Sequence, residues 1–232
     1  MSKTWAILPV KQFHRAKTRL RPVLTRPECT SIARMMAIDM LRLLSSVEEL
    51  DGIVVVGGGP DQERLARMHG CDYVSDDSTL DISRNLMRVC GLPRISTATR
   101  LLYVPADLPL LTVHDVARLL ARRNRGLTIC RAMRDGGTNA MLATPGSRMT
   151  FSLGANSAER HAQGASTGKG QFELLDDIAF QRDIDVPEDL AWLCRYGDSG
   201  KTVEYLRESK VGTRIMASFP ESLASWTVQP CT

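Results

Sequence analysis

The sequence predicts an α/β protein built on a mainly parallel sheet. Apolar strand-like runs alternate with helix-like segments along the 232-residue chain. The run GIVVV at residues 52–56 has no polar alternation, which is typical of a strand buried on both faces, as in parallel sheets. Hydrophobic residues make up 43% of the chain and charged residues 24%, an ordinary composition for a globular protein.

Each element has its own signal, and the first helix has the sharpest one. Thr25 can cap a helix, Pro27 suits the first turn, and Glu28 completes the spacing of a capping box. Apolar residues then recur at helical spacing. Strands are expected at 5–10, 52–56, 71–74, 100–104, 127–130 and 139–143, and helices at 28–44, 60–68, 82–90, 113–121, 157–165 and 187–195.

The chain divides into a main domain, residues 1–196, and a C-terminal appendage, residues 197–232. The appendage is polar and contains Gly197, Gly200 and Gly212, so we expect it either to dock or to stay mobile.

Composition excludes several classes of protein. No apolar run approaches about 18 residues and the start predicts no secretory signal, so neither a membrane partner nor export is expected. The six cysteines are widely spaced, which favours reduced thiols and a cytoplasmic location. The net charge of +4 is mild, and aromatic residues, at 5%, do not interleave with the basic ones, so no nucleic-acid partner is expected.

Ligands of such sheets bind beyond the carboxyl ends of the strands, here after residues 10, 56, 104, 143 and 184. The stretch PVKQFHRAKTRL follows the first strand and offers Lys11, Lys17 and Arg19. A triphosphate needs several cations at close range, although a solvated basic loop would have the same sequence.

Carboxylates follow two further segments. The stretch VPADLPLL places Asp107 between two prolines after an apolar strand, where a turn-capping role is the alternative. In DIDVPEDL, Asp183 and Asp185 are expected at the end of another strand, pointing the same way. Asp185 precedes the capping position of the next helix, so its carboxylate is free. Two oxygen donors from separate strand ends suit Mg²⁺, which takes its remaining ligands from waters and phosphates.

Two glycine-containing loops complete the candidates. In DGGTNAM, the glycines allow close backbone approach and Thr138 adds a hydroxyl, although a hairpin turn is the alternative. In SLGANSAERH, Gly154 and Ser157 introduce a helix whose N-terminus suits an anion, with Arg160 on its first turn. An ordinary serine-capped helix is the alternative there.

Five motifs, PVKQFHRAKTRL, VPADLPLL, DGGTNAM, LGANSAERH and DIDVPEDL, occur in an order and spacing that resemble a known family. This is the 2-phospho-L-lactate guanylyltransferase family of coenzyme F-420 biosynthesis, and the likeness spans about residues 4–195. Its wider superfamily is that of the MobA-like nucleotidyltransferases. The resemblance implies a Rossmann-like three-layer sandwich and makes residues 1–196 a nucleotidyltransferase domain.

The resemblance also implies a reaction. GTP and a small phosphorylated acid would give a guanylyl-diphospho acid and pyrophosphate, the acid being 3-phospho-D-glycerate, phosphoenolpyruvate or 2-phospho-L-lactate. The matching positions are Thr138, Gly154 and Ser157 for the acid and Asp107 and Asp185 for Mg²⁺. Arg160, on the first turn of the same helix, is a further candidate for holding the acid. Lys11, Lys17, Arg19 and Asp81 would bind the nucleotide, and Lys17 and Arg19 would be catalytic by holding the leaving pyrophosphate.

Three positions depart from the family pattern. Gly57–Gly59 replace an S-D-type strand end, and Asp81 stands where the family usually has Asn near the nucleotide. Val186 replaces a helix-capping Thr, which should cost about 1 kcal/mol of stability.

These departures leave two alternatives open. One is another nucleotidyltransferase, joining CTP or GTP to a cofactor or sugar phosphate, and the other is a non-catalytic GTP-binding regulatory protein. A homodimer could form through the apolar helices 28–44 and 113–121. No linear motif selects the acid, because pocket shape does.

Overall fold

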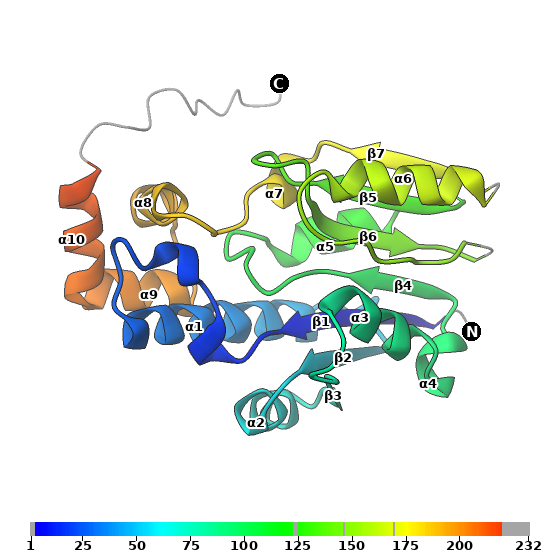
Figure 1. The fold of residues 1–232 in the computed structure, drawn as a ribbon, viewed down its shortest axis with the longest axis horizontal. Helices are drawn as coiled ribbons and strands as arrows, with labels where there is room; N and C mark the ends of the chain where they lie inside the picture. Colours follow the sequence, from blue (N-terminus) through cyan, green and yellow to red (C-terminus); the bar gives the residue numbers. More distant parts are fainter. Residues whose placement is uncertain (1–2, 123–124, 146, 169, 220–232) are drawn as a thin grey trace.

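The computed structural model describes residues 3–122, 125–145, 147–168 and 170–219. Within them, a seven-stranded sheet in the order β3-β2-β1-β4-β6-β5-β7 lies between two layers of helices (Figure 1). The predicted α/β three-layer fold is therefore confirmed. The strands are β1 (Thr4–Val10), β2 (Gly52–Gly57), β3 (Asp72–Ser75), β4 (Arg100–Tyr103), β5 (Leu127–Arg131), β6 (Thr138–Ala143) and β7 (Phe172–Leu175).

The helices begin where their sequence signals stand. At Thr25 the predicted capping box is present, with the side chain of Glu28 accepting from the Thr25 N–H at 2.7 Å. The helices are α1 (Arg26–Ser45), α2 (Pro60–Met68), α3 (Ile82–Cys90), α4 (Pro93–Ser96), α5 (Val113–Leu120), α6 (Ser157–Thr167), α7 (Ile178–Gln181), α8 (Pro187–Tyr196), α9 (Lys201–Glu208) and α10 (Lys210–Ser218), with the 3₁₀ turns η1 (Phe13–Arg15) and η2 (Thr18–Leu20).

The core forms on both faces of the sheet. On β1 and β2, Leu8 and Val55 face the layer of α1, α2, α5 and α7. Ile7 and Val54 face the layer of α3, α4 and α6. The unbroken apolar run of β2 is thus buried on both sides, as predicted from its lack of alternation.

One strand runs against the others. β6 is antiparallel to β4 and β5, whereas the other described pairings are parallel. The expectation of a ligand site after residue 143 is therefore wrong. Because β6 is reversed, its first residue, Thr138, lies at the edge where the parallel strands end.

The segment that carries Asp183 and Asp185 is not a strand. After β7 the chain forms α7 and then a non-repetitive stretch, so the strand predicted to end at 183–185 is wrong. Ile184 is fully buried and its N–H donates to the Asp107 carbonyl at 3.0 Å. This single contact brings the two predicted acidic motifs side by side.

The helices α8, α9 and α10 gather beyond one end of the sheet (Figure 1). Apolar side chains of α9 and α10 share one buried cluster with α1 and α8. On α1, the carboxylate of Asp39 accepts from the backbone N–H groups of Lys201 and Thr202 at 2.6 and 2.8 Å. The described part of the appendage therefore docks on α1 and α8. Residues 220–232 lie outside the described residues. The boundary between the two predicted domains stays a prediction.

Two chemical features of the described residues bear on the expectations from composition. None of their helices combines the length and the apolar composition that crossing a bilayer requires. The five cysteines among them are free thiols.

Candidate active site

A cavity of about 420 Å³ opens at the carboxyl edge of the sheet. It collects residues from four of the five sequence motifs, and only DGGTNAM contributes no wall residue. Candidates that line it are Lys11, Lys17, Asp107, Gly154 and Asp185. The carboxyl ends of β1 and β4 meet here, as expected for ligand sites in such sheets.

Asp107, Asp183 and Asp185, here called the acidic pole, converge on one lysine. Lys17 Nζ lies 2.7 Å from Asp107 Oδ2 and 3.9 Å from Asp185 Oδ1, and it donates to the Ile184 carbonyl at 2.6 Å. The two carboxylates are thus less than a nanometre apart on the same rim of the sheet. Only 10% of the Lys17 side chain is exposed, so the ammonium is held between them.

The acidic pole concentrates negative charge. Burial alone would lower the pKa of Lys17, but the charges of Asp107 and then Asp185 outweigh it and raise that pKa above its usual value. Burial, reinforced by the charge of Asp107, raises the pKa of Asp183 to about 6. Lys17 and Arg19, which pairs with Asp185, offset two of the three carboxylates, so a further cation would relieve the repulsion that remains.

Asp185 is positioned by the start of α8. Its carboxylate pairs with the exposed guanidinium of Arg19 at 2.6 Å. The buried Asp189 accepts from the N–H groups of Asp185 and Val186 at 2.8 and 2.9 Å and also pairs with Arg134. Val186 has no side-chain oxygen, so only the half of the capping box in which Asp189 accepts from the N–H of the N-cap residue is present.

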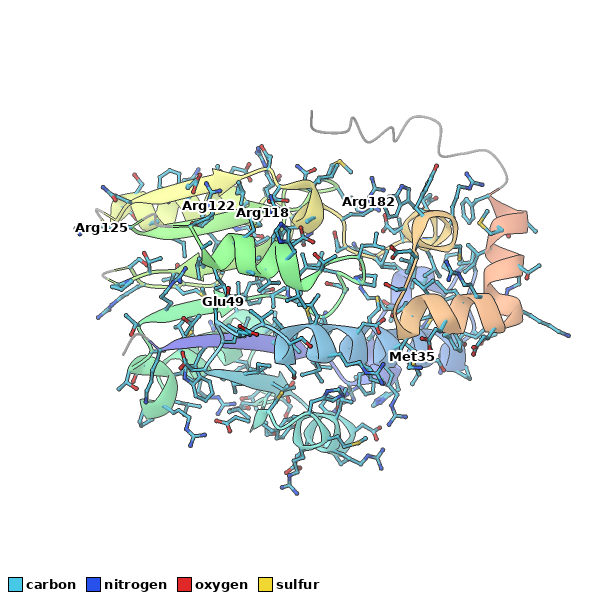
Figure 2. The ribbon with its side chains drawn as sticks, turned by 180° about the vertical axis from the view of Figure 1, so that it is seen from behind. Met35, Glu49, Arg118, Arg122, Arg125 and Arg182 are labelled. Carbon is cyan, nitrogen blue, oxygen red and sulfur yellow. The ribbon has the colours of Figure 1, made fainter. Side chains whose placement is uncertain are left out.

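The loop before α8 has a second anchor. Arg182 stacks over the ring of Trp192 at 4.2 Å, which ties residues 182–186 to α8. Figure 2 shows Arg182 beside α8 and Arg118 on α5. Arg118 instead pairs with Asp177 at 2.8 Å and joins α5 to α7. Of these two arginines, only Arg182 supports the site.

A neutral cluster, here called the hydroxyl pocket, lies next to the cavity-lining Gly154 and consists of Thr138, Ser157 and His161. Thr138 Oγ1 lies 2.8 Å from Ser157 Oγ and 2.9 Å from His161 Nδ1, and Ser152 N–H donates to His161 Nε2 at 2.8 Å. Ser157 and His161 are fully or almost fully buried, and Thr138 is 7% exposed. Burial lowers the pKa of His161 to about 4, so the ring is neutral at pH 7.

The turn at Gly154 joins this pocket to the cavity. Gly154 has φ +117°, which favours glycine, and its carbonyl accepts from the Ser157 N–H at 3.1 Å. The guanidinium of Arg160 donates to the carbonyls of Ala155 and Ser152 at 2.6 and 2.8 Å. Arg160 therefore holds the shape of the turn, and its predicted contact with the acid stays a prediction.

The nucleotide candidates lie at the other side of the cavity. Lys11 lines it, and its carbonyl accepts from Gln62 at 3.1 Å. Asp81 is exposed and caps α3, accepting from the Arg84 N–H at 2.8 Å, while the adjacent Ile82 lines the cavity. A carboxylate engaged as a cap is less available to a base, so the role of Asp81 stays a prediction.

Sequence reasoning missed the central place of His161. It lies four residues after Ser157 on α6, so both side chains share one helix face. That spacing was a usable signal, but the Thr138 contact depends on the reversed direction of β6. No group of three or more His, Cys, Asp or Glu able to hold a metal occurs among the described residues.

The fold is similar to that of solved nucleotidyltransferases. A solved protein from Desulfovibrio desulfuricans G20, described as a nucleotide-diphospho-sugar transferase, has a TM-score of 0.76 at 18% identity, covering 94% of this chain and 98% of its own. A nucleotidyl transferase from Methanothermobacter thermautotrophicus has a TM-score of 0.58 at 12% identity, covering 90% and 100%. These likenesses establish the fold.

The chain belongs to the guanylyl transferase CofC like family, whose model matches residues 4–223, and it is a transferase enzyme. A phosphoenolpyruvate guanylyltransferase of Roseiflexus sp. is 35% identical, covering 82% of this chain and 84% of its own. A 2-phospho-L-lactate guanylyltransferase of Methanothermobacter thermautotrophicus is 28% identical, with 89% and 91% covered. A 3-phospho-D-glycerate guanylyltransferase of Phenylobacterium zucineum is 30% identical, with 88% and 96% covered. The predicted family is confirmed.

Proposed function

We propose that this enzyme transfers GMP from GTP to a small phosphorylated acid and releases pyrophosphate, in coenzyme F-420 biosynthesis. Phosphoenolpyruvate, 2-phospho-L-lactate and 3-phospho-D-glycerate are the candidate acids, because relatives named for each of them match most of the chain. The observation that carries the proposal is that Asp107 and Asp185 both contact the ammonium of Lys17 at the rim of the cavity.

The chemistry needs no protein base. A phosphate oxygen of the acid attacks the α-phosphorus of GTP, the new P–O bond forms, and the bond to the β-phosphate oxygen breaks. Pyrophosphate leaves with that electron pair, and because phosphate monoesters are largely ionised at pH 7, no proton has to be removed. The enzyme therefore contributes position and charge compensation.

The residues present fit a magnesium ion. Asp107 and Asp185 would hold it through carboxylate oxygens, and the Lys17 ammonium between them marks a place where positive charge is favoured. When bound, Mg²⁺ supplies charge neutralisation for the phosphates. With only two protein carboxylates as ligands, the remaining ligands would be waters and phosphate oxygens.

The other charged groups hold the two substrates. Lys17 and Arg19, released in part from Asp107 and Asp185, face the leaving pyrophosphate, together with Lys11. Thr138, with Ser157 behind it, and the Gly154 turn hold the acid. A cytoplasmic location and a homodimer remain predictions.

Pyrophosphate release tests this proposal. Each of the four NTPs is combined with each of the three acids, and products are identified by mass. We expect release with GTP and one acid far above the other combinations. Release with CTP and a sugar phosphate instead would favour the other nucleotidyltransferase activity, and GTP binding without release would favour a regulatory protein.

A further inference from the structure

The hydrogen bonds of His161 fix which nitrogen carries its proton. Ser152 N–H can only donate, so His161 Nε2, 2.8 Å away, must be the acceptor and carry no proton. The ring is neutral at pH 7, which leaves its single proton on Nδ1. Nδ1–H then donates to Thr138 Oγ1 at 2.9 Å.

The direction of the next bond follows from burial. Ser157 is fully buried, and Thr138 Oγ1 is the partner of its hydroxyl at 2.8 Å. A buried hydroxyl proton without an acceptor is costly, so Ser157 donates to Thr138. Thr138 Oγ1 thus accepts two hydrogen bonds, which fill both of its lone pairs.

The hydroxyl proton of Thr138 is consequently left over. Thr138 does not line the cavity itself, but it is the most exposed member of the hydroxyl pocket, at 7%, and its partner Ser157 is hydrogen-bonded to the cavity-lining Gly154. Of the two hydroxyls, the O–H of Thr138 is therefore the one left for an incoming acceptor. A hydroxyl that accepts two hydrogen bonds is polarised and becomes a better donor. With the opposite tautomer, Nδ1 would accept the Thr138 proton and leave no donor for a ligand.

We propose that His161 is a positioning residue that makes the Thr138 hydroxyl an obligatory donor to an anionic oxygen of the phosphorylated acid. The proposal rests on the proposed function for the identity of the ligand. His161 does not touch the acid itself, and it acts through Thr138. Its bond to Ser152 also holds the backbone beside the cavity-lining Gly154 turn, so one ring fixes the position of both Thr138 and that turn.

A pair of amide variants separates these two bonds. In His161→Asn, the side-chain amide lies near the Nδ1 position and can still donate to Thr138, but it does not reach Ser152. In His161→Gln, the amide reaches toward Ser152 and loses the donor to Thr138. We expect His161→Gln to raise KM for the acid about tenfold or more, and His161→Asn about threefold or less.

The other kinetic constants provide the internal control. KM for GTP and kcat should stay within about threefold in both variants, because the lost bond acts on binding of the acid. His114→Gln, on the exposed face of α5, is the matched control and should change nothing. Equal KM values for the acid in the Asn and Gln variants, or a larger effect in Asn, would overturn the proposal.

A measurement on the unmodified chain is independent of variant folding and of activity. In ¹⁵N-labelled protein at pH 7, the His161 resonances should show a protonated Nδ1 and an unprotonated Nε2. A protonated Nε2 would overturn the proposal even in an active enzyme. Failure of every acid in the pyrophosphate assay, with the expected tautomer intact, would count against the proposed function and hence against the acid as ligand, while the donor assignment would stand.

Discussion

The acidic pole and the hydroxyl pocket handle anions in opposite ways. The acidic pole places three carboxylates around Lys17, partly open to solvent, and raises the pKa of Asp183 to about 6. The hydroxyl pocket carries no formal charge, is almost fully buried, and lowers the pKa of His161 to about 4. In the proposed function, the first region would recruit cations to offset phosphate charge, whereas the second would offer one oriented dipole. From this difference we propose that catalysis belongs to the first region and recognition of the acid to the second.

Removing divalent cations should have the largest effect. Because the acidic pole would bind Mg²⁺ together with the phosphates, excess EDTA should abolish pyrophosphate release and added Mg²⁺ should restore it. The hydroxyl pocket should be unaffected, which the His161 ¹⁵N resonances would report. Undiminished release in EDTA would remove the distinction between the two regions.

Low pH should destabilise the folded protein through protonation of His161 in the hydroxyl pocket. Burial, with a contribution from nearby Arg160, lowers the His161 pKa from 6.5 to about 4. The stabilisation from a neutral His161 is therefore complete above pH 6.5 and is lost as the pH falls toward 4. This contribution to the free energy of unfolding is on the order of 3 kcal/mol.

Denaturant unfolding of the unmodified chain and of His161→Asn, at pH 7 and pH 4.5, measures this contribution. The stability difference between the two proteins should shrink on acidification, because the variant has no ring to protonate. A difference that is the same at both pH values would contradict the burial argument.

Removing the Thr138 hydroxyl should weaken binding of the phosphorylated acid and leave binding of GTP unchanged. Thr138→Val keeps the shape of the side chain and should raise KM for the acid about tenfold, with KM for GTP nearly unchanged. Thr128→Val, also buried but on β5, is the matched control in steady-state assays. Parallel increases in both KM values would mean that the two regions do not divide the substrates.

Restoring a helix cap beside the acidic pole should have the smallest effect. Val186→Thr adds an oxygen at the start of α8 and should stabilise the chain by up to about 1 kcal/mol. Asp189 already accepts from the Val186 N–H, so the threonine hydroxyl would complete the capping box by accepting from the first turn. Thermal melts, with Val186→Ala as control, should show the gain without a change in turnover.

Local chemistry explains how much of the fold the sequence predicts. The capping box at Thr25 and the apolar run of β2 each depend on neighbouring residues, and both were predicted correctly. The direction of β6 was not predicted, because a short apolar strand has the same pattern in either orientation. The docking of α9 through Asp39 was also missed, since its hydrogen bonds join residues more than 160 positions apart.

In the candidate site, too, the sequence predicted residues but not most of the contacts between them. Asp107 and Asp185 were predicted as a pair because carboxylates after apolar segments are visible in the sequence, and the structure places them close together. Their contact with Lys17, and the chain of bonds through His161, depend on tertiary packing that no linear spacing encodes. Residue types therefore indicated the chemistry, and the fold determined which residues act together.

The most direct test is Mg²⁺-dependent pyrophosphate release from GTP by Asp107→Asn, Asp185→Asn and the double variant, with Asp198→Asn as an exposed control. If both carboxylates serve one cation, each single variant should lose at least about a hundredfold in turnover, and the double variant should lose little more than either. Full magnesium-dependent turnover in Asp107→Asn, or losses that simply multiply in the double variant, would contradict a shared cation.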